Sequence, residues 1–80
     1  MPAFTRENGL KVNAVKIKHV ELLTDGAILV PEDDSAEKIK VDVNFFIVHR
    51  PKANGYYVVN ELGAKSYIPA ETFERDYKED

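Results

Sequence analysis

The feature that most constrains the fold of this chain is a two-residue alternation of apolar and charged side chains. In residues 14–23, AVKIKHVELL, Val15 and Ile17 alternate with lysines. This period predicts a strand with one buried face. The alternation then slips by one position, because the next apolar residues begin at Val20. A slip would turn every later side chain to the opposite face, so we expect a bulge near His19 to restore the register.

Glycine turns divide much of the remaining chain into further strands. The Asp-Gly pair at 25–26 predicts a tight hairpin turn, with residues 27–31 as the returning strand. Residues 56–61, YYVVNE, are β-branched and aromatic at successive positions, which is typical of a central strand. Gly63 lies between this run and residues 64–68, so we expect it to make the last hairpin turn with a positive φ angle.

Two segments are candidates for short helices. Residues 38–44 alternate cleanly, and a strand could continue through residues 44–51, NFFIVHRP. A short helical turn capped by Asn44 is the alternative, and the pattern does not choose between them. After Pro69, a helical spacing would place Phe73 and Tyr77 on one face, which predicts a short helix at the C-terminal end.

These elements predict an α+β fold that is mainly antiparallel, with about five strands in hairpins and one or two short helices, the last at the C-terminus. Eighty residues are enough for a single domain, 1–80. We expect residues 1–12 to form a flexible arm and residues 78–80 a flexible tail. Of Tyr56 and Tyr57, which alternate across a strand, one is expected in the core and the other at least partly exposed.

Charge and apolar runs argue against two classes of partner. The net charge is −3, and the whole acidic excess lies in residues 71–80. A duplex-DNA binder instead needs a basic face. The longest strongly apolar run, Phe45–Val48, is far too short to span a bilayer, so no membrane association is expected. The absence of cysteine favours a reducing, cytosolic setting.

The polar residues do not form a recognisable catalytic motif. His19 and His49 are the side chains that titrate near neutral pH, but neither Ser35 nor Ser66 has the sequence surroundings of a catalytic nucleophile. The acidic run at 32–37, EDDSAE, lacks the alternating ligands and central glycine of a calcium loop. We therefore predict a protein without catalytic activity, cofactor or metal site.

The last third of the chain resembles a family of small proteins of tailed bacteriophages and bacterial prophages. Members end in a Gly-Tyr-Tyr-Val-Val strand, a glycine turn, a Lys-Ser-Tyr strand, Pro-Ala, and a final Phe-Glu and Tyr. The matching residues here are His49, Pro51, Gly55, Tyr56, Tyr57, Val58, Val59, Glu61, Gly63, Lys65, Ser66, Tyr67, Pro69, Ala70, Phe73, Glu74 and Tyr77. A weaker similarity extends back through residues 13–30. The turn departs from the family pattern, because Asn60 and Ala64 replace its two tyrosines.

The resemblance implies a phage or prophage origin and a helical turn at 44–50, and it implies no particular activity. With that origin, the expected location is the cytoplasm of a bacterial host, with association with a virion as the alternative. We therefore predict an accessory protein that binds another phage or host protein. Tyr57, Lys65 and Tyr67 on the last hairpin are the candidate contact residues, since tyrosines beside a lysine are typical of interface centres. The alternative is a single-strand nucleic-acid binder that uses the lysines of two strands. Those residues are Lys16, Lys18, Lys38 and Lys40. The pattern predicts no particular oligomeric state.

Overall fold

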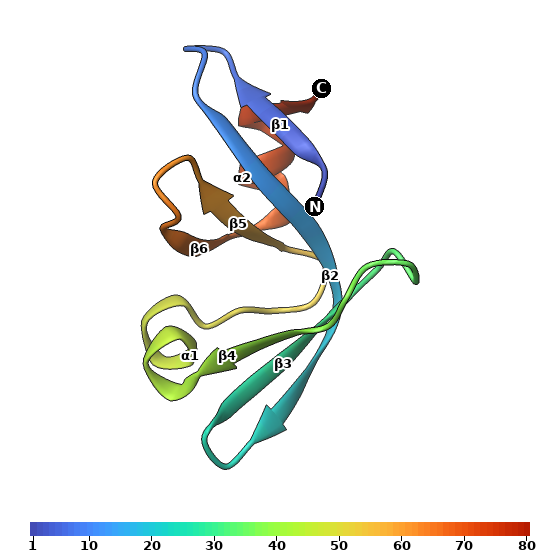
Figure 1. Cartoon of the computed structure of the whole chain (residues 1–80), viewed down its shortest axis with the longest axis vertical. Coiled ribbons are helices and arrows are strands. Elements are labelled where there is room, and N and C mark those ends of the chain that lie inside the picture. The colour runs from blue at the N-terminus through green and yellow to red at the C-terminus, as the bar shows by residue number, and fades with distance from the viewer.

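The computed structural model describes residues 1–80, and the long strand β2, Lys11–Leu23, organises it. The first half of β2 pairs with β5, Tyr56–Asn60, and the second half pairs with β3, Gly26–Pro31. Strand β3 pairs in turn with β4, Ile39–Asp42, and β5 pairs with β6, Lys65–Ile68. All of these pairings are antiparallel. Figure 1 shows β2 running along most of the molecule and joining the two groups of strands.

Strands β2 to β6 follow the connectivity of the OB-fold, a five-stranded barrel that is partly open. The barrel is open here because β4 and β6, the last strands of the two groups, do not pair with each other. Helix α1, Val43–His49, follows β4 in the chain and contacts both β4 and β6. We call the open side between β4 and β6 the seam.

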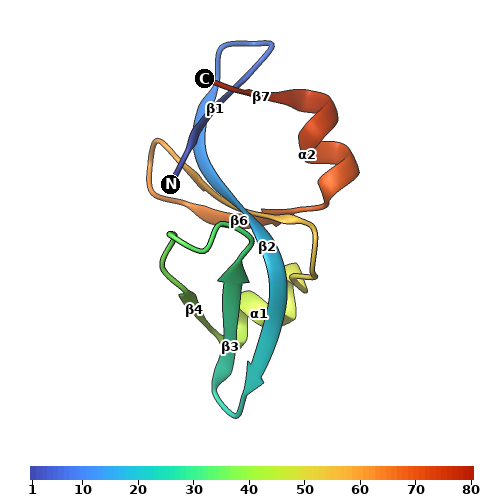
Figure 2. The ribbon, with the colours of Figure 1, turned by 90° about the vertical axis from the view of Figure 1, so that its right-hand side faces the viewer.

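The N-terminal and C-terminal segments of the chain pair with each other beside the first half of β2. Strand β1, Ala3–Arg6, pairs with β2 on one side and with β7, Tyr77–Glu79, on the other. Helix α2, Ala70–Asp76, leads into β7 (Figure 2). Strand β1, the start of β2 and most of β7 thus lie within residues 1–12 and 78–80, where the sequence analysis expects a flexible arm and a flexible tail. Strand β1 forms a hairpin with β2 through the turn at 7–10, where Asn8-Gly9 is a local signal that the sequence analysis missed. Strand β7 is only three residues long and pairs with a segment distant in sequence, so it has no local pattern that would reveal it.

Two hydrophobic clusters lie on opposite faces of β2 and β5. The first fills the barrel and contains Val15, Ile17, Ala27, Leu29, Val41 and Tyr57. The second lies under α2 and contains Val12, Ala14, Tyr56, Val58 and Phe73. Successive residues of a strand point to opposite faces, so both faces of the central strand β5 are covered. As a result Tyr56 and Tyr57 are both buried, and the expectation that one of them would be partly exposed is wrong.

Residues 43–49 are helical, which decides between the two interpretations of this segment. The Asp42 carboxylate caps the helix by accepting a hydrogen bond from the Phe45 backbone N–H at 2.8 Å. The expected cap, Asn44, lies inside the helix, and Val43 ends the strand alternation instead of continuing it. An aspartate at the cap satisfies a backbone donor that has no partner within the helix. The helix ends at Arg50, which has a left-handed conformation with φ 46°.

Several local predictions are confirmed. The register of β2 against β3 shifts between Ile17 and His19, where the bulge was expected. A tight turn connects these strands as expected, but it lies at 24–25, so Gly26 begins β3 instead of lying in the turn. Gly63 has φ 83° in the β5–β6 turn. Helix α2 places Phe73 in the core, with the Tyr77 ring stacked on it at 4.5 Å between centroids. The overall α+β class, with the second short helix near the C-terminus, is as predicted.

Candidate functional site

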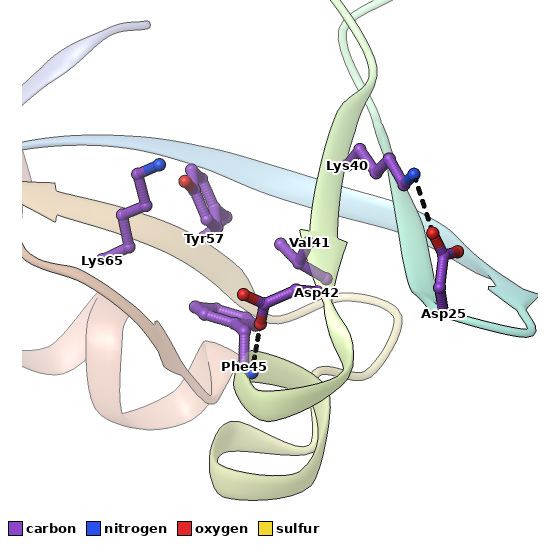
Figure 3. A pocket seen from close by; sticks show the side chains of 7 residues that line it. All are labelled: Asp25, Lys40, Val41, Asp42, Phe45, Tyr57 and Lys65. Atoms are coloured by element: carbon purple, nitrogen blue, oxygen red, sulfur yellow. Dashed lines mark hydrogen bonds and ion pairs between the residues drawn. The ribbon is translucent and has the colours of Figure 1, made fainter.

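The seam contains a hollow of about 360 Å³ between β4 and the β5–β6 hairpin. Figure 3 shows its side chains, which come from the β2–β3 turn, β4, α1, β5 and β6. They are Asp25, Lys40, Val41, Asp42, Phe45, Tyr57 and Lys65. Residues from five segments, between Asp25 and Lys65 in the sequence, thus meet at the open side of the barrel.

The floor of the hollow is apolar and aromatic. Val41 and Tyr57 belong to the first cluster, and the Phe45 and Tyr57 rings are in contact, with centroids 5.8 Å apart. Burial raises the pKa of the Tyr57 phenol. At ordinary pH this side chain is therefore uncharged, and it can offer an apolar ring with a hydroxyl group.

The rim of the hollow is charged, and most of its charges have partners. Lys40 forms an ion pair with Asp25, with nitrogen and oxygen 3.2 Å apart. The Asp42 carboxylate accepts the N-terminal hydrogen bond of α1. Lys65 is exposed and takes part in none of the four ion pairs of the structure. Lys65 and Asp42 are therefore the two charged side chains of the seam without an ion pair, and Lys65 is the positive one.

The structure brings two of the three predicted contact residues into the seam. Tyr57 and Lys65 both line the hollow, although Tyr57 is buried and only Lys65 is exposed. Tyr67 is half-buried and lies over Gly55, where its ring occupies the space that a Cβ atom would need. Tyr67 therefore packs against the barrel and does not line the hollow. The pairings Val59–Lys65 and Tyr57–Tyr67 place these side chains on the barrel face of the sheet.

The sequence analysis missed the contributions of Asp25, Asp42 and Phe45 to the seam. The only signals were the Asp-Gly turn and the ability of aspartate to cap a helix. Neither signal shows that these residues face the last hairpin. They approach it only because the barrel folds, and a local sequence pattern does not show this.

The four lysines of the alternative site are not gathered on one surface. Lys16 lies over the Tyr56 ring on the α2 side, with its nitrogen 5.9 Å from the ring centroid, whereas Lys40 lies at the seam. Lys16 and Lys40 each pair with a carboxylate, Glu74 at 3.3 Å and Asp25 at 3.2 Å. Lys18 and Lys38 are exposed and have no ion pair.

A polar cluster under α2 joins the helix to the sheet. The Tyr56 hydroxyl donates a hydrogen bond to the Glu74 carboxylate at 2.8 Å, and the Lys16 ammonium lies 3.3 Å from the same oxygen. The hydrogen bond from Tyr56, followed by the contacts of Lys16, lowers the pKa of Glu74. Burial, followed by the hydrogen bond to Glu74, raises the pKa of Tyr56 to about 12.

We expect this cluster to make the stability of the fold depend on pH in the alkaline range. The folded state favours the neutral phenol of Tyr56, so its contribution is complete below the ordinary pKa of 10 and is lost as the pH rises toward about 12. Between pH 8 and pH 11, wild type should lose roughly 1 kcal/mol more stability than the Tyr56→Phe variant. Urea unfolding of both proteins at the two pH values measures this difference. Parallel losses in the two proteins would contradict the prediction.

The histidines and serines do not assemble into a catalytic arrangement. His19 is exposed and lies 3.6 Å from Glu21, and the His49 ring packs on Phe45 at 4.5 Å between centroids. The Ser35 hydroxyl donates to Asp33, and the hydrogen bonds from Ser35 lower the pKa of that carboxyl. No group of three or more acidic or histidine side chains is arranged to hold a metal ion. Neither helix is long and apolar enough to cross a bilayer.

Comparison with known proteins gives one informative match. A solution NMR structure of the monomeric form of the phage L decoration protein superimposes on 96% of this chain with a TM-score of 0.75. The likeness is one of fold. Sequence identity is 22%, and the match covers 57% of the decoration protein, so this chain spans a little over half of its length. No protein-family model matches the sequence, and no curated protein matches it significantly.

Proposed function

We propose that this chain is a non-enzymatic accessory protein of a tailed phage or prophage and binds a protein on the surface of the phage particle. The likeness in fold to the phage L decoration protein carries the proposal, because it extends over nearly the whole chain. The resemblance of residues 49–77 to phage and prophage proteins supports it independently. A fold by itself does not specify a function, so the binding surface must be argued from its residues.

We place the binding surface at the seam and the adjoining face of α1. No residue of α1 is buried, and its apolar residues Val43, Ile47 and Val48 are 46%, 56% and 73% exposed. Val43 and Ile47 are one helical turn apart, so they form an exposed apolar stripe on α1. Clustered apolar area that is bordered by charge is characteristic of a protein-binding surface.

Particle binding tests the proposal directly. The probe is purified particles of the phage that encodes the chain, grown without this gene so that its sites are free. We expect wild type to co-sediment with these particles, and we expect Lys65→Glu to weaken the affinity about tenfold or more, since it reverses the one positive charge of the seam that has no ion pair. Lys78→Glu on the distant strand β7 makes the same charge change and should bind like wild type.

The outcomes distinguish whether the protein binds particles at all from where on its surface the binding site lies. A wild-type protein that does not bind particles would show that the proposed function is wrong. Equal binding by wild type, Lys65→Glu and Lys78→Glu would place the contact outside the seam.

The OB-like connectivity supports a second candidate, binding of single-stranded nucleic acid, because such barrels often bind oligonucleotides. The exposed lysines Lys18 and Lys38 would then make the contacts. Titration of a labelled oligonucleotide at two salt concentrations tests this candidate, since phosphate contacts weaken steeply with salt. Binding that falls with salt and is lost in a Lys18→Glu, Lys38→Glu variant would favour it over the first.

A further inference from the structure

The register of β6 shows which of its backbone groups face the seam. The Asn60 N–H donates to the Ala64 carbonyl at 3.0 Å, which makes these two residues a hydrogen-bonded pair at the start of the hairpin. Hydrogen-bonded pairs recur at every second residue of an antiparallel ladder. The backbone groups of the alternate residues, Lys65 and Tyr67, therefore point away from β5 and toward the open edge.

The same reasoning applies to β4. The two-residue turn at 24–25 makes Leu23 and Gly26 a hydrogen-bonded pair, so Gly26 and every second residue of β3 bond to β2. The intervening residues of β3 bond to β4, where their partners are Ile39 and Val41. The backbone groups of Lys40 and the N–H of Asp42 therefore point outward, whereas the Asp42 carbonyl, at the N-cap of α1, accepts the first hydrogen bond of that helix.

The outward residues of both strands surround one hollow. Lys40, Asp42 and Lys65 supply three of the four charged side chains that line it. Each strand has a neighbour on one side only, so two rows of backbone donors and acceptors without a strand partner border the same space. An extended peptide is the ligand that satisfies such rows, because it offers the complementary row of backbone groups.

The side chains specify what kind of peptide fits. Lys65 and the apolar residues Val41 and Tyr57 lie on the barrel face of their strands, as the pairing registers show. An added strand would present alternate residues to this face. One of these would contact the apolar floor, and the residue two positions away would meet the ammonium of Lys65, which has no ion pair. A second copy of this chain that used the same edges would bring lysines together, which disfavours self-pairing.

We infer that the seam binds an extended segment of the particle protein as an added strand, and that this segment carries an apolar residue and an acidic residue two positions apart. The inference rests on the proposed function and names the kind of partner that it requires.

Proline substitutions at the outward positions test the backbone contacts separately from the side chains. Lys40→Pro and Lys65→Pro each remove an outward N–H and leave the ladder hydrogen bonds in place. Lys40→Ala and Lys65→Ala remove the same side chains and keep the N–H groups. Glu79→Pro, on the outer edge of β7, controls for the effect of an edge proline. Thermal unfolding confirms that each variant is folded.

We expect each seam proline to weaken binding to the phage particles at least tenfold beyond its alanine counterpart, and we expect Glu79→Pro to bind like wild type. Amide hydrogen exchange of wild type on the particle gives a second readout that requires no substitution. The amides of Lys40, Asp42, Lys65 and Tyr67 should exchange at least tenfold more slowly in the bound state.

Two results would overturn the inference and leave the proposed function intact. One is binding of the proline and alanine variants with equal affinity. The other is bound wild-type protein in which none of the four amides is protected. Failure of wild type to bind particles would overturn the proposed function and this inference together.

Discussion

Truncation of Phe73 to alanine is expected to destabilise the fold by about 3–5 kcal/mol. The Phe73 side chain is 1% exposed and lies at the centre of the second cluster. Its ring stacks on Tyr56 at 4.1 Å and on Tyr77 at 4.5 Å between centroids, and the Phe4 ring meets it edge-on at 4.9 Å. Alanine would therefore leave a cavity that three other rings border, and it would remove the main contact of α2 with the sheet.

This loss is large relative to the total stability of an 80-residue domain, which is roughly 4–12 kcal/mol. Urea unfolding monitored by circular dichroism measures it. Leu62→Ala is the control, because Leu62 is 93% exposed and its truncation should change the stability by less than about 0.5 kcal/mol. Similar effects of the two truncations would show that α2 is not packed as described.

Replacing Gly26 with alanine is expected to cost about 3 kcal/mol. Gly26 has φ 153°, a conformation that residues with a side chain rarely adopt. A Cβ atom at this position would also collide with the Val41 carbonyl oxygen and crowd the Asp42 backbone of the neighbouring strand. Because the obstructing atoms are backbone atoms, relief would require β3 and β4 to separate at the end that leads into α1.

Gly9→Ala separates the effect of conformation from that of the collision. Gly9 also has a positive φ, 88°, but no atom lies within 4 Å of the position of its Cβ. Its replacement should therefore cost only about 1 kcal/mol, from backbone strain. Equal unfolding midpoints for the two variants would show that the close approach of β3 and β4 is absent in solution.

The strands and turns of the barrel could be predicted because their signals are local. The alternation at Val15 and Ile17, its slip at the bulge and the positive φ of Gly63 each depend on a few neighbouring residues. The alternation left open whether residues 44–50 form a strand or a helix, and the cap was misplaced because Asp42 and Asn44 are both good helix caps. The burial of both Tyr56 and Tyr57 could not be predicted, because it depends on α2 covering one face of β5 while the barrel encloses the other.

The candidate site was only partly predictable for the same reason. Lys65 and Tyr57 were identified from the composition of the last hairpin, and both lie at the seam. The opposite side of the seam comes from β4, which is more than twenty residues earlier in the chain. Whether β4 and β6 pair or leave a hollow depends on the closure of the barrel. No run of residues encodes that closure, so the open edge had to be found in the structure.

The shared strand β2 has a consequence for how the molecule unfolds. Its even-numbered residues Val12 and Ala14 belong to one cluster, and its odd-numbered residues Val15 and Ile17 belong to the other. Neither cluster can lose its part of β2 without disturbing the strand that supports the other. We therefore expect a single cooperative transition, in which probes near α2 and probes near the β2–β3 turn report the same midpoint.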